Sequence, residues 1–325
     1  MPTPESSFPD PRQKSLSGRS AQQSLSILIP CLNEERAVAG VVTEFRDAFP
    51  EARILVVDNG SVDDTPSRAR AAGADVLAER RRGKGQAVAT AFSQLDSDVV
   101  IMVDGDGSYP AEGARRLLEA YLVAPVDMVT GIRTPLAEGT PFRPFHRIGS
   151  WLFAQAMRFV FSYTPTDLFS GLRLFSKRFY RNVPLLFRGF ELETELTIQA
   201  VEKGFRLAEA PIPFRERAAG TSSKLRTLRD GVRILRLILV LFRDYKPFVF
   251  FSAVSACFFL AGLAAGIVPV REYAVSHMVG HFPLAILAAA LMNLALFCLL
   301  TGIMLESNLR HRREAWQIEL RNFRP

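Results

Sequence analysis

Two aspartates that flank a glycine are the residues whose chemistry is easiest to read in this chain. Asp104 and Asp106 follow the apolar run Val99–Val103, which predicts a buried strand. An acidic pair at the end of such a strand predicts a site at the carboxyl edge of an α/β sheet, where carboxylates can hold a divalent cation and a diphosphate. Taken alone, the pair could also be a solvated Asp-Gly turn.

Alternating apolar runs and helical stretches surround this pair and predict the elements that position it. Strands are expected at 25–30, 52–58, 74–78, 99–104 and 126–131, and helices at 34–49, 63–72, 84–95 and 111–123. Such a strand–helix series predicts an α/β fold with a mostly parallel sheet. Sheets of this kind bind their ligands at the carboxyl ends of the strands.

Three further polar clusters lie at the ends of these elements. Residues 30–34 (Pro-Cys-Leu-Asn-Glu) end the first strand, residues 58–65 (Asp-Asn-Gly-Ser-Val-Asp-Asp-Thr) end the second, and residues 82–85 (Arg-Gly-Lys-Gly) open the helix before the Asp104 strand. Singly, each could be a helix cap, a turn or a solvated loop. Four polar clusters in this order are hard to obtain from turn chemistry alone, which favours one binding edge.

In their order and spacing, these clusters resemble the nucleotide-sugar half of the family-2 inverting glycosyltransferases, which have the GT-A fold. The resemblance implies a nucleotide diphosphate sugar, GDP- or UDP-hexose, as the donor. The donor contacts that it implies are Pro30, Asn33, Glu34, Asp58, Asp63, Lys84, Gly85 and Asp104. It also implies a divalent cation, Mg²⁺ or Mn²⁺, held by Asp104, Asp106 and Ser108.

The downstream half resembles one branch of this family, the dolichyl- and polyprenyl-phosphate hexose synthases. Its motifs are Gly131–Arg133, Arg147, Asp167–Gly171, Glu191–Glu195 and Arg217–Lys224, and the resemblance covers about residues 25–242. The branch often has a second aspartate where Asn59 stands and a glutamine where Ser108 stands. Ser108 or water could therefore replace a metal ligand.

The branch implies a lipid monophosphate as the acceptor. Contacts to its phosphate are implied at Arg133, Arg147, Ser170, Arg217, Ser223 and Lys224, and contacts to the donor sugar at Asp167 and Glu193. Arginine suits the first task because its guanidinium grips phosphate through two hydrogen bonds. The alternatives are solvated salt bridges for the arginines and a surface acid on an amphipathic helix for Glu193.

The expected chemistry follows from charge. The cation would offset the negative charge that develops on the leaving nucleoside diphosphate. A phosphate acceptor is largely dianionic near neutral pH, so it can attack the anomeric carbon without a protein base. The expected catalytic residues are Asp104, Asp106, Arg133 and Arg147, and the four histidines form no recognisable set.

Two uncharged stretches, 248–270 and 283–305, are each long enough to cross roughly 30 Å of bilayer hydrocarbon as a helix. Buried core helices are the alternative. Just before them, Leu225–Phe242 predicts an amphipathic helix at the headgroup level. The net charge of +7 is concentrated beside the expected spans, which favours an anionic lipid surface over nucleic acid. The positive-inside rule places the catalytic domain and both termini in the cytoplasm, at the inner membrane.

The sequence thus predicts five parts, listed in chain order. They are a disordered tail at 1–24, a GT-A catalytic domain at 25–221, a juxtamembrane amphipathic helix at 222–246, a transmembrane hairpin at 247–305 and a basic cytoplasmic tail at 306–325. The expected function is inverting hexose transfer to an undecaprenyl- or dolichyl-type polyprenyl phosphate, a step of glycolipid biosynthesis. A family-2 transferase acting on another glycan or lipid acceptor, a degenerate transferase serving as a membrane scaffold, and a homo-oligomer stay open.

Overall fold

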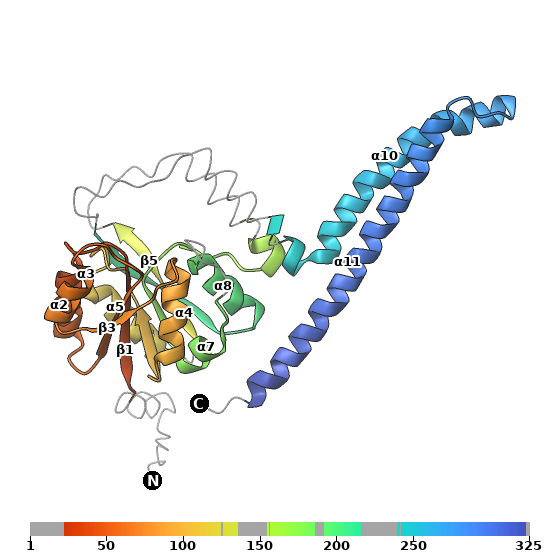
Figure 1. Ribbon diagram of the computed structural model, residues 1–325. Coiled ribbons are helices and arrows are strands. Elements are labelled where there is room, and N and C mark those ends of the chain that lie inside the picture. Colours follow the sequence, from red (N-terminus) through yellow and green to blue (C-terminus); the bar gives the residue numbers. More distant parts are fainter. Residues whose placement is uncertain are drawn as a thin grey trace, which may run out of the picture. The chain divides into compact units, whose positions relative to one another are not determined.

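The chain folds into an α/β unit and a helical unit (Figure 1). The computed structural model describes residues 23–124, 126–135, 155, 157–185, 192–215, 239–240 and 242–322. Of these, the residues up to 135 and those from 165 to 215 belong to the α/β unit, and the residues from 155 to 164 and from 239 onward belong to the helical unit. The expected boundaries of the five parts stay predictions, and most of the expected N-terminal tail lies outside the described residues.

A mixed sheet forms the centre of the α/β unit. Within the described residues it has seven strands in the order β3-β2-β1-β4-β6-β5-β7. The strands are β1 (Leu25–Cys31), β2 (Arg53–Asp58), β3 (Asp75–Ala78), β4 (Val99–Met102), β5 (Met128–Pro135), β6 (Arg173–Ser176) and β7 (Leu207–Phe214). Neighbours pair in parallel except at β6, which runs antiparallel to both β4 and β5. The expected α/β fold with a mostly parallel sheet is therefore confirmed.

Helices cover both faces of this sheet. They are α2 (Val38–Ala48), α3 (Thr65–Ala71), α4 (Lys84–Gln94), α5 (Ala111–Val123), α7 (Lys177–Asn182) and α8 (Leu192–Glu202). Helices α2, α3 and α5 lie on one face, and α4 and α7 lie on the other (Figure 1).

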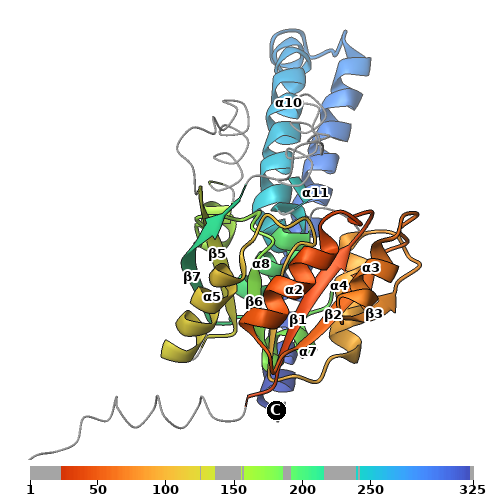
Figure 2. The same ribbon diagram turned by 90° about the vertical axis from the view of Figure 1, so that its left-hand side faces the viewer.

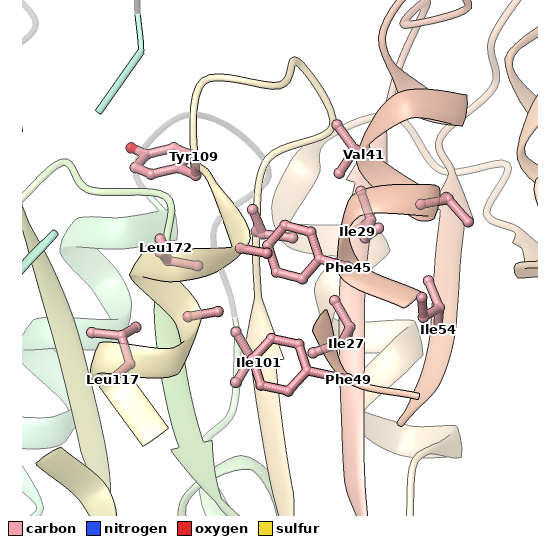
Figure 3. Packing of buried hydrophobic residues seen from close by; sticks show 14 of the residues in the cluster. Ile27, Ile29, Val41, Phe45, Phe49, Ile54, Ile101, Tyr109, Leu117 and Leu172 are labelled. Atoms are coloured by element: carbon pink, nitrogen blue, oxygen red, sulfur yellow. The ribbon is translucent and has the colours of Figure 1, made fainter. Parts of the chain in front are cut away.

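The core between α2, α5 and the sheet fixes the strands that lead to the candidate site (Figure 3). Ile27 of β1 and Ile101 of β4 are fully buried near Phe45 of α2, whose ring stacks on that of Phe49 at 6.3 Å between centroids. Burial of each such side chain contributes about 1.5–3 kcal/mol relative to its exposure. β1 and β4 are thereby held side by side, so the loops that follow them start from fixed points.

Two strands, β6 and β7, are not among those expected from the sequence. β6 begins with a charged residue, Arg173, and β7 contains Pro211 and Pro213, which weaken the strand pattern. β7 tolerates its prolines because it is an edge strand, where one row of N–H groups has no partner strand. Pairing with β7 also carries β5 past the expected end of that strand, as far as Pro135.

The helical unit contains two long apolar helices, α10 (Pro247–Ser276) and α11 (Phe282–Asn322), which lie side by side as a hairpin (Figures 1 and 2). Both are long and apolar enough to cross a membrane, judged by length and composition, and the expected spans lie within them. Only 6% of the most apolar window of α10 and 11% of that of α11 are buried. Core helices of a soluble protein are mostly buried, so this alternative is disfavoured.

Small residues line the contact between α10 and α11. A Cβ atom on Gly262 would lie 3.2 Å from the Leu291 side chain. The Ser255 hydroxyl donates a hydrogen bond of 2.7 Å to the carbonyl oxygen of Ala295. Close packing at small residues and hydrogen bonds between helices are the interactions that hold helices together in lipid, where burial of apolar surface does not drive association.

Aromatic contacts bring a distant segment to the start of this hairpin. The ring of Phe159 stacks on that of Phe242 at 5.5 Å between centroids, and the ring of Phe161 meets that of Tyr245 edge-on at 5.1 Å. The helical unit therefore includes residues that precede the hairpin by about 80 positions. Of the expected amphipathic helix Leu225–Phe242, only residues 239, 240 and 242 are described.

Helix packing on the sheet generates a test with a matched control. A Cβ atom on Gly113 of α5 would lie 2.9 Å from the Leu172 side chain, whereas one on Gly40 of α2 would meet nothing within 4 Å. We expect Gly113→Ala to lower the free energy of unfolding by about 1–3 kcal/mol through overpacking. Gly40→Ala should raise it by about 0.5–1 kcal/mol, because alanine favours the helix.

Thermal unfolding of the detergent-solubilised full chain, followed by circular dichroism, measures both changes as shifts in Tm. Equal stabilisation by the two substitutions would contradict the close approach of α5 to the sheet.

Candidate active site

The loops that follow β1, β2 and β4 lie at one edge of the sheet. β1 and β2 are paired up to Cys31 and Asp58, and β1 and β4 up to Leu28 and Met102. Asp104 follows β4 by two residues and so lies at the same edge. Parallel pairing thus brings three of the four polar clusters to one rim, and residues 82–85 join them through contacts of Gly83 with Asn59 and of Lys84 with Asp104.

The loops after β1 and β2 bind each other directly. Asn33 Oδ1 accepts a hydrogen bond of 2.9 Å from the Val62 backbone, and the Asn33 backbone donates one of 2.9 Å to Ser61 Oγ. Asn33 has a left-handed backbone with φ of 57°, a conformation that asparagine tolerates better than most residues. The Glu34 backbone donates to Thr65 Oγ1 at 2.8 Å. Pro30 is buried in β1. These hydrogen bonds join the loops after β1 and β2 into one continuous surface at the rim.

The two aspartates of the second cluster have different surroundings. Asp63 Oδ1 accepts hydrogen bonds from the backbone and hydroxyl of Thr65, and Asp63 Oδ2 accepts one of 3.3 Å from the Glu35 backbone. Burial opposes its charged form, but the Thr65 hydrogen bonds lower the pKa of Asp63. Asp58 Oδ1 accepts one bond of 3.2 Å from Ser61, and its other oxygen has no partner among the described residues. Asp58, although only 9% exposed, therefore has fewer hydrogen bonds within the chain than Asp63.

Asn59 acts as a clamp on the loop that leads to α4. Its side-chain nitrogen donates to the carbonyl oxygens of Glu79 at 3.2 Å and Arg81 at 2.7 Å, and its oxygen accepts from the Gly83 backbone at 2.6 Å. An amide can donate and accept in this way, whereas an ionised aspartate can only accept. This explains why the chain can depart here from the branch that it resembles.

Lys84 and Gly85 open α4, and Lys84 joins two other expected site residues. Its Nζ lies 2.5 Å from Asp104 Oδ1 and 2.5 Å from Glu193 Oε1. Burial opposes a charged ammonium, but the two carboxylates raise the pKa of Lys84 well above its usual range. Lys84 is therefore protonated at neutral pH and links two acidic side chains that lie 20 and 109 residues along the chain from it.

Glu193 is not a surface acid, which corrects that alternative. Helix α8 is buried from Leu192 to Ala200, and Glu193 is only 6% exposed. An amphipathic pattern is therefore the wrong description of α8. Some of its polar side chains find partners inside the fold, as Thr197 does with Arg173, whereas the buried Thr194 hydroxyl has no hydrogen-bond partner among the described residues.

Asp104 lies in close contact with the backbone on its other side. A Cβ atom on Gly171 would lie 2.1 Å from Asp104 Oδ2, so only glycine fits there. Beneath the loop, a Cβ atom on Gly105 would lie 2.4 Å from Cys31 Sγ. Burial and the nearby carboxylates raise the pKa of the Cys31 thiol above its usual range, so this cysteine is neutral packing material.

Asp106 and Ser108 form a turn after Asp104. Asp106 Oδ1 accepts hydrogen bonds from the Ser108 backbone, at 3.0 Å, and from the Ser108 hydroxyl. Ser108 is 2% exposed, so its evident role is to orient Asp106. A metal contact by Ser108 stays a prediction.

Two carboxylates are available to a divalent cation at this rim, those of Asp104 and Asp106. Within the described residues no group of three or more His, Cys, Asp or Glu side chains could hold a metal. Asp104 and Asp106 supply two carboxylates on one short loop. Mg²⁺ is commonly bound by one or two carboxylates together with substrate phosphates, so these residues fit a cation whose shell the donor diphosphate completes.

Arg133 is expected to contact the acceptor phosphate and Asp167 the donor sugar, but the two side chains bind each other. Asp167 accepts hydrogen bonds from Arg133 Nε at 2.7 Å, Nη2 at 2.9 Å and the Arg133 backbone at 3.2 Å. The guanidinium also lies over the Phe214 ring, 5.4 Å from its centroid. Burial opposes the charge, but the Asp167 hydrogen bonds raise the pKa of Arg133. Both side chains keep some exposure, 28% and 14%, so the pair can still face a ligand.

Arg173 is a site-supporting residue that sequence reasoning missed. It is fully buried and donates to the carbonyl oxygens of Leu168 at 2.6 Å and Ser170 at 3.1 Å, and to Thr197 Oγ1 of α8 at 2.9 Å. It therefore ties the loop with Asp167 to the helix with Glu193. The available signal was a lone arginine within the apolar run around β6, which predicts a buried charge with dedicated partners.

The remaining expected acceptor residues cannot be placed in the site. Ser170 is fully buried, so the described arrangement does not present it to a ligand. Arg147, Arg217, Ser223 and Lys224 lie outside the described residues. Their roles stay predictions.

Comparisons with known proteins define the class. The model of glycosyl transferase family 2 matches residues 26–183. A dolichyl-phosphate hexose transferase of Haloferax volcanii is 32% identical over 217 residues, which cover 66% of this chain and 92% of that relative. Glycosyltransferase AglJ of the same organism is 29% identical over 299 residues, which cover 91% of this chain and 97% of that relative.

Solved structures show the same fold. Glucosyl-3-phosphoglycerate synthase from Mycobacterium tuberculosis, in complex with Mn²⁺ and UDP-glucose, matches with a TM-score of 0.56 and 19% identity over 74% of this chain and 85% of that one. Fold and relatives together define a glycosyltransferase. The chain belongs to glycosyltransferase family 2, as its motifs predict.

The Asn59 clamp generates a prediction. Asn59→Asp should lower the free energy of unfolding by about 1–3 kcal/mol and weaken nucleotide binding, because a carboxylate would face two carbonyl oxygens that have lost their donor. Thermal unfolding and nucleotide titration of the full chain measure the two effects. Asn182→Asp is the control, since that amide donates a single bond, to the Arg178 carbonyl oxygen. Unchanged behaviour of Asn59→Asp would show that other contacts hold the loop.

Proposed function

We propose that this enzyme transfers a hexose from a nucleotide diphosphate sugar to a polyprenyl phosphate, with inversion at the anomeric carbon. The observation that carries the proposal is the pair of exposed apolar helices on the same chain as the donor site, because a long isoprenoid phosphate resides in a bilayer. The dolichyl-phosphate hexose transferase relative supports the same acceptor class.

The donor side of the reaction rests on the rim residues. Asp58 is proposed to contact the nucleoside, and Lys84 the diphosphate. Asp104 and Asp106 would hold Mg²⁺ or Mn²⁺, which when bound offsets negative charge on the leaving nucleoside diphosphate. The proximity of Lys84 to Asp104, at 2.5 Å, supports a shared diphosphate and cation site.

The acceptor side is proposed to use cationic side chains. Arg133, held in place by Asp167, would bind the lipid phosphate, with Arg147, Arg217 and Lys224 as further proposed contacts. The dianionic phosphate itself is the nucleophile, so the mechanism requires no protein base. Membrane insertion of α10 and α11, with the catalytic unit and both termini on the cytoplasmic side, is part of this proposal.

A direct assay tests the function. The full chain in liposomes is incubated with Mn²⁺ or Mg²⁺, a panel of UDP- and GDP-hexoses and undecaprenyl or dolichyl phosphate, and products are identified by mass. We expect a polyprenyl phosphate that carries one hexose, formed from one of the donors. Because the structural neighbours include complexes with phosphoglyceric acid, a parallel incubation contains that acid as the acceptor. Transfer to the soluble acid alone would overturn the lipid acceptor.

Asp106→Asn tests the cation site. Asparagine keeps an oxygen that can accept the Ser108 hydrogen bonds but loses the charge, so folding should be intact. We expect kcat to fall by about 10²-fold or more, since the cation acts on charge that is largest in the transition state. Steady-state kinetics at saturating Mg²⁺ measure this change in kcat. Turnover near that of the natural protein would place the cation elsewhere.

The Arg133–Asp167 pair yields a separate prediction. Arg133→Ala and Asp167→Ala should each raise KM for the lipid phosphate, and the double variant should be no worse than either, because the two residues act as one unit. Arg53→Ala, which breaks an exposed ion pair with Asp75, is the control. Loss of nucleotide binding in calorimetry would instead move the pair to the donor side.

A further inference from the structure

Lys84 is held between two carboxylates in a cation-binding position. Its Nζ lies 2.5 Å from both Asp104 Oδ1 and Glu193 Oε1. The side chains of Lys84 and Asp104 are 21% and 23% exposed, whereas that of Glu193 is 8% exposed. The ammonium therefore has one partner at the open rim and one partner inside the fold.

The Asp104 carboxylate has little room for a second cationic partner. The Gly171 backbone covers one side so closely that a Cβ atom would lie 2.1 Å from Oδ2. Lys84 is paired with Oδ1. A divalent cation that binds Asp104 must therefore share this carboxylate with the ammonium or displace it.

Charge favours displacement. Lys84 carries one formal positive charge, and Asp104, Asp106 and Glu193 carry three negative charges. The group therefore has a net charge of −2, which one divalent cation would neutralise. A divalent cation close to the ammonium would nevertheless be repelled strongly, because charges at about 4 Å in a partly buried site interact by several kcal/mol. Moving the ammonium toward another anion removes this repulsion, and the donor diphosphate is such an anion.

We infer that Lys84 is an exchangeable counter-ion: it neutralises Asp104 before the donor binds and turns to the donor diphosphate when a divalent cation takes its place on Asp104. This inference rests on the proposed donor and cation site. Glu193 keeps one side of the ammonium fixed, and the flexible four-carbon stem of lysine allows the head group to turn.

The exchange has a thermodynamic consequence. A cation alone must break the Lys84–Asp104 pair without compensation, and a diphosphate alone meets an ammonium already neutralised by two carboxylates. When both bind, the cation neutralises the Asp104 carboxylate that Lys84 leaves, and the diphosphate neutralises the Lys84 ammonium that the cation displaces. The cation and the nucleoside diphosphate should therefore bind with positive coupling, and the coupling should be reciprocal.

Mn²⁺ binding to the detergent-solubilised full chain tests this, with free Mn²⁺ read from its electron paramagnetic resonance signal. Titrations are made without nucleotide and with saturating UDP or, in parallel, GDP. For the natural protein we expect weak binding of Mn²⁺ alone and clearly tighter binding with one nucleotide. Lys84→Met should bind Mn²⁺ alone about tenfold more tightly, because the competing charge is gone. In this variant, the ratio of the Mn²⁺ affinity with nucleotide to that without nucleotide should fall toward one.

Three further variants keep the test interpretable. Glu193→Gln leaves Lys84 with Asp104 as its only carboxylate partner among the described residues, so Mn²⁺ alone should bind more weakly than to the natural protein. If Lys84→Met does not fold because Glu193 is left buried and unpaired, Lys84→Met combined with Glu193→Gln removes the two charges together and should still tighten Mn²⁺ binding. Lys177→Met, which breaks a pair with the exposed Asp96, is the control and should change nothing.

The outcomes separate the inference from the function on which it rests. Unchanged Mn²⁺ affinity and unchanged coupling in the Lys84 variants would overturn the exchange while leaving the cation site in place. Absence of Mn²⁺ binding to the natural protein with either nucleotide would overturn the proposed cation site itself.

Discussion

The arrangement of the catalytic unit depends on one constraint: a protonated lysine must be neutralised where three chain segments meet. Lys84 at the start of α4 pairs with Asp104 after β4 and with Glu193 on α8. Leaving any one of these charges buried without a partner is costly, so the three segments must adopt their relative positions together. The sheet supplies the alignment, and the packing of α2 and α5 on β1 and β4 makes it rigid.

Sequence reasoning located the rim but not its internal bonding. The polar ends of β1, β2 and β4 were predictable because parallel strands align their carboxyl ends and apolar runs mark the strands. The Arg133–Asp167 pair was not, because the partners lie 34 residues apart and only the antiparallel β6 returns the chain to β5. β7 was hidden by its prolines. The burial of α8 was hidden by its polar residues, of which Glu193 pairs with Lys84 of α4 and Thr197 with Arg173 of β6.

Several residues that a motif would count as ligand contacts also build the site. Asp63 bonds to Thr65 and Glu35, Ser108 orients Asp106, and Asn59 holds the loop before α4. A motif records which residue types occur at a binding edge and cannot separate those that touch the ligand from those that hold the loops. Hydrogen-bond partners make that separation, because a carboxylate engaged by two backbone N–H groups has fewer positions left for a ligand.

The contacts of Phe159 with Phe242 and of Phe161 with Tyr245 affect how the chain is made. A ribosome synthesises Phe159 and Phe161 about 80 residues before Phe242 and Tyr245, which at roughly 5–20 residues per second is a delay of several seconds. During that interval Phe159 and Phe161 lack these two partners, and Phe159 remains 62% exposed even in the folded chain. These aromatic contacts therefore form only after the segment just before α10 has been synthesised.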